Sequence, residues 1–301
     1  MNGHYTNGKQ RFYCLVCHKS FSWQNKAVKR SKEYVWFKRW MIEGYSVRQL
    51  SSQSGLSSGK IRGIINYWLN RFPQRVIDYK PFRNLVFDGT FIYRRLASAL
   101  GILDSQTGKL IAGGYDIKET SSPQLLTFFA SLKQAGLRPE SCTTDGNSQA
   151  IACLKTVWPE LIIQRCLVHI QRQGLMWCRV NPRTTEAKKL RKLFVAVTTI
   201  KTVEQKDLFL KALDKWEKAY GRKIACRPEK GWIFPDLKRA RSVLLKALPD
   251  MFHYLENHSI PFTTNQIEGY FSRLKDKYHD HRGLSPQRRR SYFTWYFFLK
   301  P

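Results

Sequence analysis

The chain has 301 residues, of which 43% are hydrophobic and 14% aromatic, enough to bury a sizeable core. Its formal net charge of +30 favours a polyanionic partner. Seven cysteines without regular spacing argue against a disulfide framework and for a reducing compartment. No apolar run approaches the roughly 18–20 residues of a membrane span, and the start lacks the basic-then-apolar pattern of a secretory signal. We therefore expect a cytoplasmic, nucleoid-associated protein.

The positive charge is unevenly distributed along the chain. Residues 1–80 carry 15 Lys and Arg against 3 Asp and Glu, a net of +12, and residues 178–260 carry 19 against 9, a net of +10. Residues 81–177 carry 10 against 7, a net of only +3, and residues 261–301 carry 8 against 3, a net of +5. This pattern fits a carboxylate site flanked by phosphate-binding segments; a merely basic, solvated surface is the alternative.

Residues 1–28 contain a single Cys-x-x-Cys pair, Cys14 and Cys17. Two thiolates on a tight knuckle form half of a tetrahedral zinc site, and His4 and His18 are poorly spaced to complete it. The segment is therefore predicted to be part of a zinc ribbon that binds Zn²⁺ with another knuckle upstream. Two ordinary reduced cysteines are the alternative.

Residues 29–80 are predicted to form three helices. Apolar residues at helical spacing mark the first and the third, Gly44 ends the first, and Ser46 can cap the second. A helix, a turn with glycine and another helix make a helix-turn-helix DNA-binding pattern. Lys60 and Arg62 stand near the start of its last helix, where such helices meet the major groove. A generic three-helix cap is the alternative.

Residues 81–177 predict an α/β core. The apolar run Asn84–Tyr93 fits a buried strand that carries Asp88, although Asp88 and Gly89 could instead form a hairpin turn. Further strands are expected at Ser98–Leu103, Leu110–Tyr115, Ser141–Thr144 and Leu161–Gln164, and helices at Pro123–Ala135 and Gln149–Trp158. This order predicts a ribonuclease-H-like fold with a mixed five-stranded sheet, in which the first and fourth strands are neighbours.

Three carboxylates are the candidate catalytic residues. Asp145 follows the fourth strand and should lie beside Asp88, where two bare carboxylates repel unless a dication lies between them. Glu268, on the first turn of a later helix, would complete two sites for Mg²⁺ or Mn²⁺. Each also has a structural alternative: Asp145 in an Asp-Gly-Asn turn, and Glu268 in a capping box with Asn265.

Four motifs carry a resemblance to bacterial insertion-sequence transposases of the Mutator-like group. They are Phe87–Thr90, Thr144–Gly146, Gln164–His169 and Thr264–Glu268. The Cys-x-x-His element of the third motif, Cys166 and His169, is the most specific. Because two ligands do not close a zinc site, we expect these two residues to pack as a helix turn beside the active site. Direct help with DNA or a cation is the alternative.

The resemblance implies an Asp-Asp-Glu ribonuclease-H-like core, with an all-α insertion at 178–260 and a final core segment at 261–301 that carries Glu268. It further implies a transposase that binds the ends of its own element, cleaves DNA and joins a strand to target DNA, as a homodimer or larger assembly. The alternatives are a non-catalytic DNA-binding regulator derived from a truncated transposase and a metal-dependent nuclease without strand transfer. His279 and His281 are expected to contact phosphate or solvent.

Overall fold

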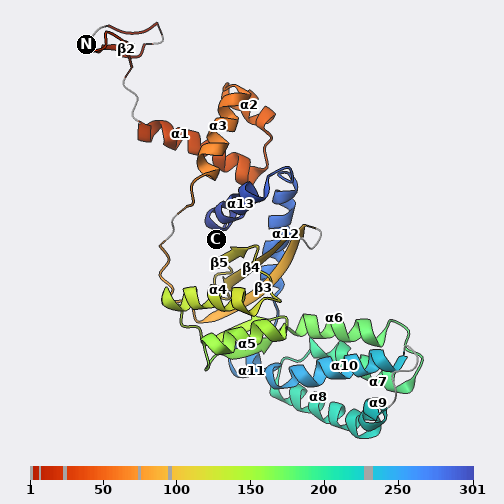
Figure 1. Ribbon diagram of the computed structural model, residues 1–301. Helices are drawn as coiled ribbons and strands as arrows, with labels where there is room; N and C mark the ends of the chain where they lie inside the picture. Colours follow the sequence, from red (N-terminus) through yellow and green to blue (C-terminus); the bar gives the residue numbers. More distant parts are fainter. Residues whose placement is uncertain (1–2, 7, 23–25, 74–75, 94–96, 227–232) are drawn as a thin grey trace. The chain divides into compact units, whose positions relative to one another are not determined.

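The computed structural model describes residues 3–6, 8–22, 26–73, 76–93, 97–226 and 233–301. The chain forms two compact units (Figure 1). The first contains Met1–Pro73 and Lys277–Leu299, and the second contains Gln74–Asp276 and Lys300–Pro301. Among the described residues, no helix has both the length and the apolar character that crossing a bilayer requires.

The described part of the first unit combines a small ribbon with helices. Its elements are β1 (Phe12–Tyr13), β2 (Ser20–Phe21), α1 (Lys26–Lys38) with a π-helical extension (Arg39–Glu43), α2 (Val47–Ser54), α3 (Ser58–Leu69) and α13 (Pro286–Leu299). Gly44, at φ 77°, ends the first helix, and Ser46 caps α2 in a capping box with Gln49. Trp295 of the C-terminal helix donates from Nε1 to the carbonyl oxygens of Trp68 and Arg71 at 2.9 and 2.8 Å. The helix α13 is thereby tied to α3 within this unit.

His281 is part of the core of this first unit. It is 7% exposed, and its Nε2 lies 3.0 Å from the carbonyl oxygen of Trp40. A carbonyl can only accept, so Nε2 carries the proton, and burial lowers the pKa of the ring below its usual value. The prediction that His281 contacts phosphate or solvent is therefore wrong, because aromatic packing against Trp40 and Tyr292 takes the ring out of water.

The second unit is built around a mixed five-stranded sheet of order β5-β4-β3-β6-β7. The strands are β3 (Asn84–Tyr93), β4 (Ala97–Asp104), β5 (Leu110–Tyr115), β6 (Ser141–Thr144) and β7 (Ile162–Arg165). The first three are antiparallel, while β6 and β7 add in parallel. The predicted pairing of the first and fourth core strands is confirmed. The hairpin alternative for Asp88 and Gly89 is wrong, because both residues pair with β4 inside one continuous strand.

The two faces of the sheet are covered by different helices. Phe87 belongs to an apolar core that β3 and β4 share with α4 (Ser122–Gln134) and α5 (Ser148–Val157). Side chains alternate along a strand, so Asp88 points to the other face. There Gly101, its partner on β4, lies against Ile267 and Phe271 of α12 (Asn265–His279). Asp88 and the Glu268 helix therefore share one face of the sheet.

A helical segment separates β7 from α12. It comprises α6 (Leu167–Cys178), α7 (Thr185–Val197), α8 (Val203–Trp216) with a π-helical extension (Glu217–Gly221), α9 (Arg222–Cys226), α10 (Ile233–Ala247), a 3₁₀ turn (Leu248–Asp250) and α11 (His253–Glu256). These helices enclose an apolar core of their own, which includes Leu190, Phe194 and Leu244. The chain then returns to the sheet, where Thr143 of β6 donates to the Pro261 carbonyl oxygen at 2.6 Å.

Candidate active site

Asp88 lies in the middle of β3 and is only 8% exposed. The backbone N–H of Gly89 donates to its Oδ1 at 2.8 Å, which favours the ionised form. Burial, together with the negative charges of Asp145 and Glu119, has the opposite and larger effect and raises the pKa of Asp88 to about 7. A carboxylate at this position is therefore destabilised unless a cation joins it.

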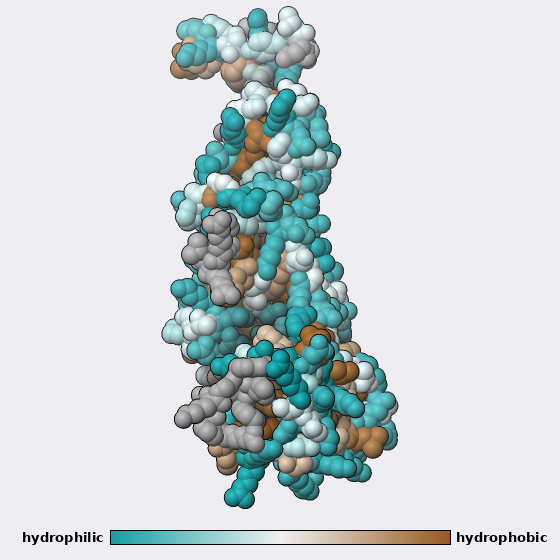
Figure 2. All heavy atoms as spheres, turned by 90° about the vertical axis from the view of Figure 1, so that its right-hand side faces the viewer, coloured by the Kyte–Doolittle hydropathy of each residue, from teal (hydrophilic) through white to brown (hydrophobic). Residues whose placement is uncertain are grey.

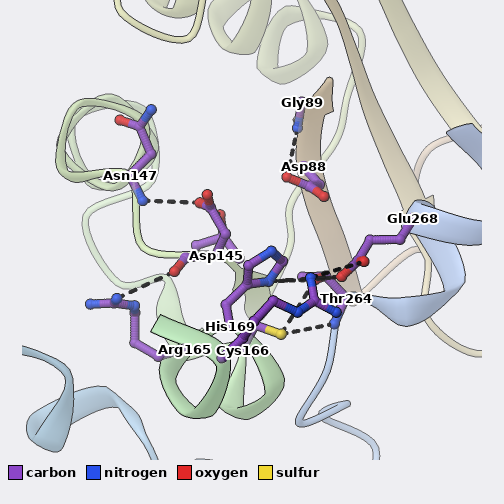
Figure 3. A network of polar contacts seen from close by, with 11 residues as sticks. Asp88, Gly89, Asp145, Asn147, Arg165, Cys166, His169, Thr264 and Glu268 are labelled. Carbon is purple, nitrogen blue, oxygen red and sulfur yellow. Dashed lines mark hydrogen bonds and ion pairs between the residues drawn. The ribbon is translucent and has the colours of Figure 1, made fainter. Parts of the chain in front are cut away.

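Asp145 follows the last residue of β6, at the carboxyl end of that strand. The backbone N–H of Asn147 donates to its Oδ1 at 3.0 Å, and Arg165 donates to its carbonyl oxygen at 3.3 Å. The side chain of Asn147 caps α5 by accepting from the N–H groups of Gln149 and Ala150. The Asp-Gly-Asn turn is thus present, but Asn147 provides the cap, and Figure 3 shows Asp145 across a common space from Asp88.

Glu268 is held in the first turn of α12. The carbonyl oxygen of Thr264 accepts from the N–H groups of Ile267 and Glu268, both at 3.1 Å, and α12 begins at Asn265. The alternative of a capping box led by Asn265 is therefore wrong, since Thr264 precedes the helix. The Glu268 carboxylate lies 3.8 Å from Nδ1 of His169 and 3.7 Å from Arg172.

Cys166 is the N-cap of α6 and His169 lies in its first turn, beside the carboxylates (Figure 3). The hydrogen bond to Cys166, helped by the charges of Asp88 and Glu268, raises the pKa of His169 to about 9. Burial alone would raise the pKa of the Cys166 thiol, but hydrogen bonds from His169 and Thr264 outweigh it and lower that pKa. The pair therefore presents a positive imidazolium to the carboxylates.

Glu119 is a fourth carboxylate of the site that sequence reasoning missed. It stands in the loop between β5 and α4, where burial and the charge of Asp145 raise its pKa to about 7. Its Oε1 is buried without a hydrogen-bond partner among the described residues. A Cβ at position 89 would collide with this carboxylate. The available signal was Gly89 itself, because a glycine inside a strand often marks a close approach.

The donor set suits a hard divalent cation. Carboxylate oxygens are the ligands that Mg²⁺ prefers. Burial and the charges of neighbouring carboxylates raise the pKa values of Asp88 and Glu119, and a dication would relieve the repulsion. As the side chains stand, no three His, Cys, Asp or Glu residues in the described part of the chain converge on one metal position. Glu268 is instead turned toward His169 and Arg172.

The other predicted site residues lie in the first unit. Cys17 donates from its backbone N–H to Cys14 Sγ at 3.5 Å, and in the part of the chain that the structure describes no further ligands gather around this pair. Lys60 Nζ lies 2.6 Å from Oε1 of the buried Glu33, whereas Arg62 is exposed. The Glu33 carboxylate would therefore compete with DNA phosphate for Lys60, whereas this ion pair does not involve Arg62.

The chain was compared with known protein families and with curated proteins. No curated protein matches the chain. The family described as "Transposase, Mutator family" matches residues 49–288, a range that includes Asp88, Asp145 and Glu268. Because the match covers well over half of the 301 residues, the chain belongs to the Mutator family of transposases.

Proposed function

We propose that this transposase is an Asp-Asp-Glu enzyme whose ribonuclease-H-like core cleaves DNA and joins the freed strand to a target. One observation carries the proposal. Asp88 on β3 and Asp145 directly after the neighbouring parallel strand β6 share a site with Glu268, which the first turn of α12 brings to the same face of the sheet. The strand order β5-β4-β3-β6-β7 supports the same core.

The chemistry of the site supports metal-dependent phosphoryl transfer. Asp88, Asp145 and Glu268 would hold the divalent cations, and Glu119 adds negative charge beside them. Bound there, Mg²⁺ or Mn²⁺ supplies charge neutralisation and lowers the pKa of an attacking water or hydroxyl. The protein itself keeps Asp88 largely out of water, orients Asp145 through the Asn147 N–H, and balances the Glu268 charge with His169.

DNA is the substrate class that the charge supports. The formal net charge is +30, and hydrophilic residues cover most of the face that Figure 2 shows. The predicted helix-turn-helix would consist of the helices α2 and α3 of the first unit, and the exposed Arg62 lies in the first part of α3. We propose that this unit recognises the element ends while the second unit performs the chemistry.

The test is a cleavage and joining assay on duplex DNA bearing the cognate ends. Asp88→Asn, Asp145→Asn and Glu268→Gln should each lower the Mg²⁺-dependent rates of both steps by at least about 100-fold, because each removes a charge from the site. Glu140→Gln is the matched control, because Glu140 is exposed and pairs only loosely with Arg83, at 3.5 Å. It should leave both rates unchanged.

The outcomes separate the alternatives. Cleavage without joining by the unaltered protein would indicate a nuclease. Specific binding without any cleavage would indicate a DNA-binding regulator. Undiminished cleavage in the Asp88→Asn protein would remove Asp88 from the active site.

A further inference from the structure

The hydroxyl of Thr264 lies at the meeting point of three polar groups of the site (Figure 3). Thr264 is fully buried. Its Oγ1 is 3.3 Å from Cys166 Sγ, 3.3 Å from Nδ1 of His169 and 3.3 Å from Oε1 of Glu268. One side chain therefore touches both members of the Cys-x-x-His element and the third carboxylate.

The hydrogen-bonding capacity of these groups indicates one arrangement. A hydroxyl has one proton to donate and two lone pairs. The Cys166 sulfur already accepts from the backbone N–H of Thr264 at 3.3 Å. An ionised carboxylate can only accept. We therefore expect the Thr264 hydroxyl to donate its proton to Glu268 and to accept from His169 Nδ1–H. The direct distance between His169 and Glu268 is 3.8 Å, too long for a hydrogen bond.

The backbone around Thr264 is fastened independently of this hydroxyl. The Leu167 N–H at the start of α6 donates to the Phe262 carbonyl oxygen at 2.9 Å, and Thr143 of β6 donates to the Pro261 carbonyl oxygen at 2.6 Å. The segment that follows the helices is thus hydrogen-bonded to α6 two residues before Thr264 and to β6 three residues before it. Removing the hydroxyl should leave this anchor in place.

We infer that Thr264 is a positioning residue for Glu268: its hydroxyl links the Glu268 carboxylate to the Cys166–His169 pair and fixes its direction. The inference rests on the proposed role of Glu268 in holding a divalent cation. Without the hydroxyl, Glu268 keeps His169 and Arg172 as charged neighbours among the described residues, and the Arg172 side chain is 63% exposed. The carboxylate would then sample other rotamers and would meet the cation less often.

The experiment compares Thr264→Val, which keeps the shape but removes the hydroxyl, with Thr264→Ser, which keeps the hydroxyl. Thr156→Val is the matched control, because Thr156 is exposed and its hydroxyl bonds only within α5, to the Ala152 carbonyl oxygen. Each full-length protein is titrated with Mn²⁺ by calorimetry without DNA, and then assayed for cleavage over a range of Mg²⁺ concentrations. Thermal unfolding without metal confirms that each variant is folded.

Thr264→Val should weaken Mn²⁺ binding and raise the half-saturating Mg²⁺ concentration by about 10-fold, as expected for loss of a group that orients a ligand. Thr264→Ser should stay within about threefold of the unaltered protein, and Thr156→Val should not differ from it. Equal losses in the Val and Ser variants would overturn the role of the hydroxyl, because packing would then explain both. Mn²⁺ binding that is lost in Asp88→Asn but unchanged in Thr264→Val would overturn it while leaving the proposed active site intact. Binding unchanged in both would overturn both proposals.

Discussion

At the scale of single residues, the site concentrates negative charge that the metal-free protein must accommodate. The pKa of Asp88 is raised from its usual 3.8 to about 7 by burial and by the charges of Asp145 and Glu119. A folded-state pKa above the unfolded value means that stability is fully present below about pH 4 and is lost as the pH rises through 7. Without a cation, the ionised Asp88 therefore destabilises the folded protein at the neutral pH where the enzyme would work.

This linkage predicts that Asp88→Asn stabilises the metal-free protein at pH 8. Removing the charge should raise the free energy of unfolding by up to about 4 kcal/mol, because a pKa raised from 3.8 to about 7 corresponds to that much at about 1.4 kcal/mol per pKa unit. The gain should shrink as the pH falls from 7 toward 4, because Asp88 of the folded protein becomes protonated, and should approach zero only below about pH 4, where the carboxyl is protonated in both states. Urea unfolding in the presence of a chelator, at pH 4.5 and pH 8, measures the difference. A gain of the same size at both values would show that the Asp88 charge is not its source.

At the scale of elements, β3 approaches the loop after β5 more closely than a side chain at position 89 would allow. The missing Cβ of Gly89 is what leaves room for the Glu119 carboxylate and for Leu100 of β4. Glycine in a strand otherwise costs stability, so this position is explained by the close approach. The position of the Glu119 carboxylate therefore depends on the glycine at position 89.

Gly89→Ala should therefore destabilise the fold by about 1–3 kcal/mol, the usual cost of overpacking, and should lower cleavage by displacing Glu119. Adding Glu119→Ala should recover part of the stability, because the colliding carboxylate is gone. Gly63→Ala is the control: a Cβ there meets nothing within 4 Å, and alanine is favoured in a helix such as α3. Thermal unfolding of the unaltered protein, Gly89→Ala, Glu119→Ala, the double variant and Gly63→Ala tests this. If the changes in stability caused by Gly89→Ala and Glu119→Ala simply added, the predicted collision between a Cβ at position 89 and the Glu119 carboxylate would be contradicted.

At the scale of the whole molecule, the excess of 52 Lys and Arg over 22 Asp and Glu is the dominant property. Cationic side chains that neutralise phosphates release condensed counterions, so affinity for DNA should fall steeply with salt. Between about 50 and 200 mM salt we expect a loss of about 10³-fold or more, as for proteins with six to ten phosphate contacts. Fluorescence anisotropy with labelled duplex measures it. A flat response would mean that phosphate contacts do not dominate binding.

Much of the fold could be predicted from the sequence because the relevant signals are local. Apolar runs located the core strands to within about two residues, and Gly44 and Ser46 marked helix ends through the conformation and hydrogen bonding of their own neighbourhood. The placement of Asp88 on one strand and of Asp145 at the end of the adjacent strand followed from the order of elements. These features depend on periodicity and on contacts between residues close in the chain.

The remaining features depend on contacts between residues distant in the chain, which no local pattern records. Lys60 pairs with Glu33, 27 residues away, and His281 is buried against Trp40 from the opposite end of the sequence. Glu119 joins the carboxylates only because β3 carries a glycine where the loop after β5 approaches. Glu268 stands 123 residues after Asp145 in the sequence. It reaches the other carboxylates because the segment before α12 is hydrogen-bonded to β6 and to the start of α6. Thr264, at the end of that segment, also contacts Cys166 and His169. The sequence thus determined which residues could react, and tertiary packing decided which of them share a charge environment, because burial and Coulombic interaction depend on distance in space.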